Sequence, residues 1–153
     1  MLRKLYTFMD ELYGYVQNYT PCRKGCSFCC FIPISITELD VFFIERSLRI
    51  PRNEKKLAIL PETPCPFLVS NSCSIYMYRP FVCRKNVTFD NSPKWCHVKV
   101  GANAAMPTAQ FNSIDWAYYH LVNASGADKI YDIREIFRKC DVTSRIHVHS
   151  SIA

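Results

Sequence analysis

Nine cysteines in a chain of 153 residues constrain this protein more than any other sequence feature. Eight of them lie between residues 22 and 96, and the ninth, Cys140, stands alone. An odd number of thiols fits a closed disulfide framework poorly. Asp10 and Glu11 interrupt the apolar run near the N-terminus, so we expect no secretory signal and a cytoplasmic protein with reduced thiols. The cysteines therefore predict metal ligation or redox chemistry.

The eight clustered cysteines form two groups. In the first group, Cys26 and Cys29 form a C-x-x-C pair, which lets two sulfurs of one turn reach one ion, and Gly25 permits the backbone reversal. The second group lies in a stretch stiffened by prolines. Cys140 is expected to be a buried thiol without a ligand role, and His97 is a weaker ligand candidate. We expect these eight residues to bind metal: Cys22, Cys26, Cys29, Cys30, Cys65, Cys73, Cys83 and Cys96.

The chemistry of the ligands limits the choice of metal. Thiolates select zinc or iron–sulfur clusters over calcium or magnesium. Structural zinc takes four ligands in a tetrahedron, and a four-iron cluster also takes four thiolates, for which C-x3-C-x2-C is a familiar spacing. The adjacent side chains of Cys29 and Cys30 diverge, which predicts either two metal atoms or one thiol outside the coordination sphere. Zinc and iron–sulfur both stay open, as does the number of sites.

Apolar residues that recur at three- and four-residue steps predict several helices. The helix over residues 37–49 has a clear start signal. The side chain of Thr37 can cap its first turn, and the side chain of Asp40, three residues later, can bond back to the Thr37 amide. Residues 61–100 contain five prolines and little periodicity, so we expect an irregular region held by metal. The expected helices cover residues 2–19, 37–49, 53–60, 108–124 and 128–139, the fourth ending at Gly126 and the fifth beginning behind Asp128.

These elements predict a mainly α fold. We expect one small domain over residues 1–153, with helices around a metal-bound, proline-rich cysteine loop region. Residues 22–96 are expected to form the metal-binding region, and residues 101–140 a C-terminal helical part. No window approaches 18 consecutive apolar residues, so we expect no membrane span.

Several unrelated motifs occur in a specific order over residues 22–96. The order is Cys22-x3-Cys26-x2-Cys29-Cys30, then Cys65-Pro66-Phe67-Leu68, then Cys73-Ser74-Ile75-Tyr76-x2-Arg79-Pro80-x2-Cys83-Arg84, then Cys96. This order resembles the cysteine-cluster family described as a zinc- or iron-chelating domain, also known as YkgJ-like, whose members are small bacterial proteins. The resemblance implies metal binding. A larger relative with the same cluster, flagellin lysine N-methylase, implies by analogy a reaction on a protein.

Two arginines flank Cys83 within this string. We expect Arg79 and Arg84 at the cofactor site, where they compensate thiolate charge or donate hydrogen bonds to sulfur. Arg23, next to Cys22, has the same expected role. Arg79 can alternatively hold a carboxylate or phosphate with both ends of its guanidinium group.

The formal net charge of +6 invites a nucleic-acid partner. The basic residues form only fragments of a binding stripe, such as Lys94-Trp95, and the paired Cys and paired His of a finger are missing from the sequence. Four thiolates on one Zn²⁺ ion sum to a charge of −2, so ligation lowers the basic excess. We therefore favour a protein substrate or partner over nucleic acid, and we expect no membrane partner.

Three functions from different classes fit these features. The first is a zinc or iron–sulfur protein whose centre is structural or supports a redox or protein-modifying reaction. The second is a zinc-stabilised module that binds nucleic acid or protein. The third is an enzyme of the protein-lysine methylase type, although the chain has only four glycines and no glycine-rich loop for a methyl donor. The sequence does not decide whether the protein is an enzyme.

Overall fold

The computed structural model describes residues 1–55, 57–60, 62–89, 92, 96 and 108–138. In this part of the chain the α-helices are α1 (Leu2–Tyr15), α2 (Glu38–Leu48), α3 (Phe81–Lys85), α5 (Asn112–Ser125) and α6 (Ile133–Ile136). The strands are β1 (Ser35–Thr37), β2 (Leu68–Val69), β3 (Ser72–Cys73) and β4 (Ile130–Asp132). The 3-10 helices that lie wholly within the described residues are η1 (Gln17–Tyr19), η2 (Phe28–Phe31) and η3 (Tyr76–Tyr78). The described chain is thus helical with little sheet, as a mainly α prediction requires.

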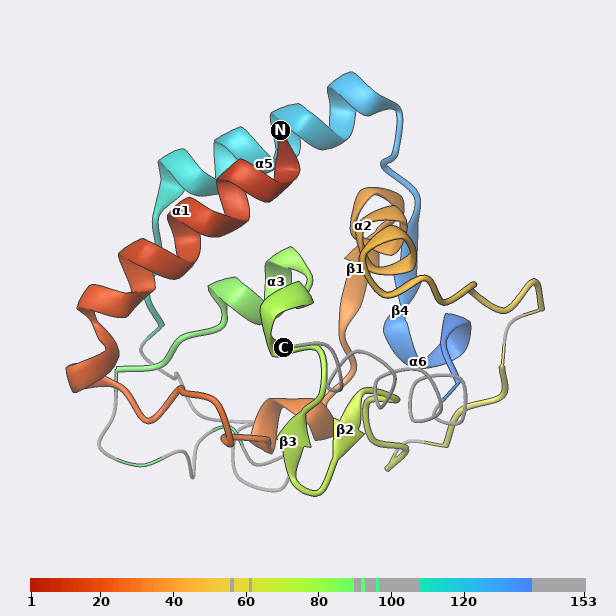
Figure 1. Ribbon diagram of the computed structural model, residues 1–153, viewed down its shortest axis with the longest axis horizontal. Helices are drawn as coiled ribbons and strands as arrows, with labels where there is room; N and C mark the ends of the chain where they lie inside the picture. Colours follow the sequence, from red (N-terminus) through yellow and green to blue (C-terminus); the bar gives the residue numbers. More distant parts are fainter. Residues whose placement is uncertain (56, 61, 90–91, 93–95, 97–107, 139–153) are drawn as a thin grey trace.

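Helices α1 and α5 lie side by side along one edge of the molecule, with α3 beneath them (Figure 1). The rings of Phe81 and Tyr118 stack at 3.8 Å between their centroids and join α3 to α5. We call the buried residues between these three helices the α1–α5 core: Tyr6, Met9, Phe81, Ile114, Tyr118 and Val122. No cysteine belongs to this core.

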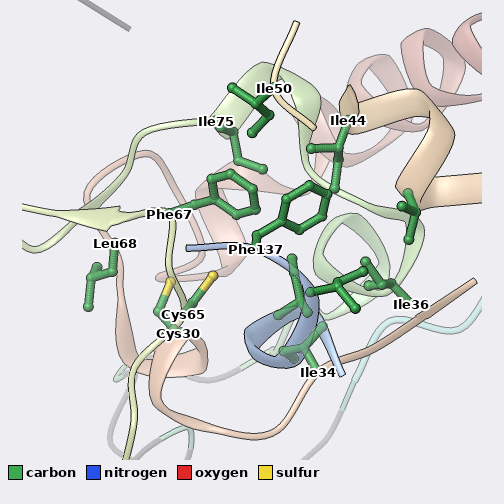
Figure 2. Packing of buried hydrophobic residues seen from close by; sticks show 13 residues of the cluster. Cys30, Ile34, Ile36, Ile44, Ile50, Cys65, Phe67, Leu68, Ile75 and Phe137 are labelled. Carbon is green, nitrogen blue, oxygen red and sulfur yellow. The ribbon is translucent and has the colours of Figure 1, made fainter. Parts of the chain in front are cut away.

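A second core packs the loop region against α2, β1, β4 and α6. Its centre is the ring pair of Phe67 and Phe137, whose centroids are 5.2 Å apart (Figure 2). Cys30 and Cys65 belong to this core, and their sulfurs lie next to each other at its edge (Figure 2). We call it the loop-side core: Cys30, Ile34, Ile36, Val41, Ile44, Ile50, Cys65, Phe67, Leu68, Ile75, Ile133, Ile136 and Phe137.

Two short antiparallel ladders hold the loop region in place. Strand β1 pairs with β4, with Ile36 opposite Tyr131. Strand β2 pairs with β3, with Leu68 opposite Cys73. The hairpin turn between β2 and β3 consists of residues 70–71, which have φ angles of 47° and 57°, as a type I′ turn requires.

Three predicted features of the helices are confirmed. The first helix is interrupted after Tyr15 and continues as η1, and the extended backbone of Thr20 ends it where expected. Helix α2 begins after Thr37, whose hydroxyl accepts a hydrogen bond from the amide of Asp40 at 3.4 Å. Helix α5 ends at Gly126, which has φ 63°. No helix in the described ranges is both long and apolar enough to cross a membrane.

The predicted helix over residues 53–60 is wrong for residues 53–55 and 57–60, which contain no helix. Their backbone is bonded elsewhere, because the amide of Asn53 donates to the carbonyl of Ile136 at 2.8 Å and the amide of Leu57 donates to Glu135 at 2.9 Å. Tertiary hydrogen bonds therefore replace the weak helical preference of this segment.

Two predicted C-terminal helices also have different boundaries. Residues 108–109 pair with the segment at residues 87–88 instead of beginning a helix, and α5 starts at Asn112. In place of a helix from Asp128, residues 130–132 form β4, and Asp132 caps the single turn of α6. Pairing with β1 outweighs the helical pattern here, and it leaves Ile130 exposed. Residue 139 lies outside the described residues.

Candidate metal centre

Seven cysteines from both predicted groups line a single cavity of about 60 Å³, which we call the thiol cavity. The seven are Cys22, Cys26, Cys29, Cys30, Cys65, Cys73 and Cys83. All are free thiols. The eighth, Cys96, is half-buried and is not among the residues that line this cavity. His97 and Cys140 lie outside the described residues.

The first group reaches the thiol cavity through a tight turn. Gly25 has φ 99°, a conformation that a residue with a side chain rarely adopts, and the amide of Cys26 donates to the carbonyl of Arg23 at 2.9 Å. The chain then enters η2, which carries Cys29 and Cys30. The predicted backbone reversal at Gly25 is therefore present, and it brings the C-x-x-C pair to one wall.

Cys22 is anchored separately from the other cysteines of its group. Its amide donates to the hydroxyl of Thr20 at 3.0 Å, and its sulfur accepts a hydrogen bond from the amide of Thr88 at 3.5 Å. Thr88 is fully buried and pairs with Thr108. A segment between Cys83 and Cys96 of the second group thus holds the first thiol in place.

The second group joins the first through the backbone. The amide of Cys65 donates to the carbonyl of Cys30 at 2.7 Å, which sets the two residues side by side. Cys73 ends the β2–β3 hairpin, and Cys83 lies in the middle of α3. Three separate local structures therefore bring Cys65, Cys73 and Cys83 of the second group to the cavity.

Helix α3 is fixed by a carboxylate on α2. Asp40 is buried, and its Oδ1 accepts hydrogen bonds from the amide of Phe81 at 3.0 Å and from the hydroxyl of Tyr6. Its Oδ2 accepts from the hydroxyl of Tyr118 at 2.6 Å. Asp40 therefore satisfies the first amide of α3 and sets the direction in which Cys83 points.

Burial dominates the electrostatics of the thiols. Burial raises the pKa of Cys83 well above its ordinary value, and it also raises the pKa of Cys73, against the opposing charge of Arg79. For Cys30, the hydrogen bond with Cys29 lowers the pKa, but the hydrogen bond with Cys65 and burial together raise it to about 12. The cavity by itself therefore favours the neutral thiol at Cys30, Cys73 and Cys83, and a metal that binds these residues must displace their protons.

Arg84 lies beside the thiol cavity and does not line it. It is 2% exposed, and its guanidinium group is fully engaged. Its Nε donates to the carbonyl of Arg79 at 2.8 Å, Nη2 donates to Met77, and Nη1 donates to both carboxylate oxygens of Asp10. Arg84 thus clamps the segment before α3 onto α1.

Arg79 does line the thiol cavity. Its Nε donates to the carbonyl of Tyr76 at 2.9 Å, and its guanidinium carbon lies 3.6 Å from the centroid of the Tyr76 ring. The structure explains the order Tyr76-x2-Arg79-Pro80-x2-Cys83-Arg84. Tyr76 orients Arg79, and Pro80 precedes α3. Cys83 lines the cavity, and Arg84 bonds to the carbonyls of Met77 and Arg79.

The donor set of the thiol cavity fits a soft metal, because its wall offers seven sulfurs and the hydrocarbon of Ile34, Phe67 and Ile75. Thiolate ligation of zinc or iron is the chemistry that these residues support. The spacing is wider than that of a site for one ion. Across the described residues, no group of three or more Cys, His, Asp or Glu side chains is close enough to hold a single ion.

Two carboxylates near the thiol cavity, those of Asp10 and Asp40, hold α3 in place, and the sequence analysis did not predict this. Asp10 binds Arg84, and Asp40 was expected only to answer Thr37 at the start of α2. A signal for Asp10 exists in the sequence, because it follows Met9 and lies four residues after Tyr6 on the apolar face of α1. An acidic residue on that face needs a partner, although the sequence does not say which one.

Comparison with known proteins matches the cysteine segment. A family model, CxxCxxCC, "Putative zinc- or iron-chelating domain", matches residues 21–97, just over half of the 153-residue chain. Comparison with the curated proteins and comparison with the solved structures found no match. The matched segment contains all seven cysteines of the thiol cavity together with Arg79 and Arg84. The chain belongs to the CxxCxxCC family of zinc- or iron-chelating domains, and it is a metal-binding cysteine-cluster protein.

Proposed function

We propose that the thiol cavity holds an iron–sulfur cluster. Seven thiols line this one cavity, more than the four that either one tetrahedral zinc ion or one four-iron cluster takes. The observation that supports the choice of a cluster is the spacing of the ligand side chains. No three ligand side chains of the described residues are spaced for one ion. A cluster of several metal atoms takes thiolates from a wider ring than one ion does.

Charge compensation favours the same proposal. Thiolates that bind a cluster are negative, and the wall of the thiol cavity carries two guanidinium groups, those of Arg23 and Arg79. Arg79 already opposes the rise in pKa of Cys73 and Cys83, so it favours their ionised forms. Hydrogen bonds and charges around the sulfurs tune the stability and potential of such a centre.

The proposed role is structural and redox. The bound cluster supplies one-electron chemistry, and the chain supplies the ligands, the charge compensation and the partial exclusion of water. In this proposal Cys29, Cys73 and Cys83 are ligands because their charges affect one another's pKa across the thiol cavity, and Cys30 and Cys65 complete the inner wall. Cys22 and Cys26 form the outer wall. A protein is the proposed redox partner, and the cytoplasm is the proposed compartment.

Anaerobic purification followed by metal and sulfide analysis tests this proposal. We expect iron and acid-labile sulfide in equal amounts and a brown protein with broad absorption in the visible range. A colourless protein with stoichiometric zinc and no sulfide would contradict it and support the zinc-stabilised interaction module instead. Cys83→Ser is expected to lose the iron, whereas the matched control Cys140→Ser is expected to keep it.

A further inference from the structure

A second cavity, of about 190 Å³, adjoins the thiol cavity, and we call it the α1 cavity. Four residues line both cavities: Cys22, Tyr76, Arg79 and Asn86. The rest of its wall comes mainly from α1 and the segment that follows it, including Asp10, Gly14, Gln17 and Thr20. The metal-binding proposal does not use this space.

Arg79 stands at the border of the two cavities with a fixed orientation. Its Nε is bonded to the carbonyl of Tyr76, and its guanidinium plane rests on the Tyr76 ring. The terminal nitrogen Nη2 lies 3.7 Å from Oδ1 of Asp10, which is longer than a normal hydrogen bond. The terminal N–H groups of Arg79 are therefore held in one orientation, and they form no hydrogen bond with Asp10.

The charges around the α1 cavity leave an excess of one positive charge. Asp10 is the acid and Arg79 and Arg84 are the bases that line it. Arg84 binds both oxygens of Asp10, and Arg79 lies 3.7 Å from one of them, so two guanidinium groups face one carboxylate and one positive charge is in excess as long as no thiolate of a bound metal compensates Arg79. A ligand of this cavity is therefore expected to be an anion with a single charge.

Neutral donors surround the same space. The side-chain amides of Gln17 and Asn86 line the α1 cavity and form no hydrogen bond with other described residues. Thr20 accepts a hydrogen bond from the amide of Cys22, which leaves its own hydroxyl proton available to donate. The wall thus offers several neutral N–H and O–H donors beside the terminal N–H groups of Arg79.

We propose that the α1 cavity binds a small monoanionic carboxylate, held by the terminal N–H groups of Arg79. A planar guanidinium group matches the two oxygens of a carboxylate in geometry. The volume of about 190 Å³ far exceeds the roughly 10–15 Å³ that one water needs, and it is smaller than the roughly 300–1,000 Å³ of sites for larger organic ligands. The single excess charge favours a carboxylate over a phosphate dianion. A carboxylate in this cavity lies beside Cys22, at the edge of the thiol cavity.

Gly14 provides a way to close the cavity without changing any charge. It lies in α1 and lines the α1 cavity, and a Cβ atom added there meets no other atom within 4 Å. Gly14 is exposed and the added Cβ stands in open space, so Gly14→Leu is expected to place its larger side chain at the mouth of the cavity and obstruct entry, while the matched control Gly14→Ala obstructs it much less. The alanine variant also shows whether a side chain is tolerated at this point of the helix.

Titration of the purified protein with trifluoroacetate, followed by 19F NMR, tests the proposal. We expect saturable broadening of the trifluoroacetate signal that acetate reverses and that neutral trifluoroacetamide does not reproduce. Arg79→Gln is expected to weaken binding by about tenfold or more, because a charge-assisted pair is lost. Arg3→Gln removes the same charge from an exposed position of α1 and is expected to change binding by less than about twofold. Gly14→Leu is expected to abolish binding, and Gly14→Ala to preserve it.

Any of these results would overturn the proposal: no saturable binding to the wild-type protein, equal binding by Arg79→Gln, equal losses in Arg79→Gln and Arg3→Gln, or competition by phosphate but not by acetate. Metal content is measured in the same samples, so loss of the metal is recognised separately from loss of the anion. If Arg79→Gln does not fold, the proposal is tested by comparing trifluoroacetate binding in Gly14→Leu and Gly14→Ala, because both variants keep Arg79. Binding that survives in Gly14→Leu would also overturn the proposal.

Discussion

The guanidinium group of Arg84 binds both carboxylate oxygens of Asp10 and so ties α3 to α1, although the residues are 74 positions apart. The side chain of Arg84 is 1% exposed and that of Asp10 is 34% exposed. Because Arg84 directly follows Cys83, which lines the thiol cavity, this ion pair also helps to hold Cys83 in position. The cysteine segment therefore depends on α1, which lies outside the residues that the family model matches.

The first prediction concerns this pair. Asp10→Asn leaves the buried charge of Arg84 without its counter-ion, and we expect a loss of about 2–3 kcal/mol in the free energy of unfolding, less than for a fully buried pair because Asp10 is partly exposed. Urea unfolding measures it. The matched control is Glu11→Gln, the next residue on α1, which is exposed and is expected to change stability by less than about 0.5 kcal/mol. Equal effects of both variants would contradict a special role for the pair.

The second prediction concerns pH. Burial, the negative charge of Asp40 and the hydrogen bond to it raise the pKa of Tyr118 above its ordinary value of about 10. The folded protein keeps this proton at a pH where the unfolded chain releases it, so stability is present below about pH 10 and falls as the pH rises further. Unfolding free energies between pH 9.5 and 12 are expected to fall less steeply in Tyr118→Phe, by up to about 1.4 kcal/mol per pH unit.

Tyr119→Phe is the control for this measurement, because the Tyr119 ring is 55% exposed and does not bind Asp40. We expect its pH profile to run parallel to that of the wild-type protein. Parallel profiles for Tyr118→Phe and the wild-type protein would show that Asp40 does not hold the Tyr118 proton in the folded state.

The third prediction concerns metal removal. Because the α1–α5 core contains no cysteine, chelation is expected to unfold the cysteine segment first. Hydrogen exchange should show early loss of protection at the amides of Cys65 and Ser74, which bond to Cys30 and Phe67 respectively, while amides of α5 stay protected. Returning the metal should restore protection. A metal-free protein with unchanged melting temperature and unchanged exchange would refute this prediction.

The fourth prediction concerns the loop-side core. Phe67 has no exposed surface, packs on Phe137 and also lines the thiol cavity. Phe67→Ala is expected to cost about 3–5 kcal/mol of stability and to reduce the amount of metal that the purified protein retains. Phe8→Ala, at a position on α1 that is 53% exposed, is expected to cost less than about 0.5 kcal/mol and to retain the metal. If a folded Phe67→Ala protein retained all of its metal, packing of the loop-side core would not be needed for metal binding, and this prediction would be wrong.

Local signals were sufficient where a helix is defined by its own ends. Thr37 and Asp40 predicted the start of α2, and Gly126 predicted the end of α5. Capping needs only residues a few positions apart, so the sequence contains the whole interaction. Predictions for residues 53–60 and 128–132 were wrong because the amides there bond to segments far along the chain.

By itself the sequence determined which kinds of ligand the site contains, because eight clustered cysteines form a donor set for a soft metal. The order of these cysteines also determined the family. Only the tertiary structure decided that seven of them share one cavity, that Arg79 borders it, and that Asp10 and Asp40 hold α3 behind it. The physical reason is distance along the chain. Thiol spacing within a turn is set by local backbone geometry, whereas the meeting of Cys30 with Cys65 and of Asp10 with Arg84 depends on how two cores pack.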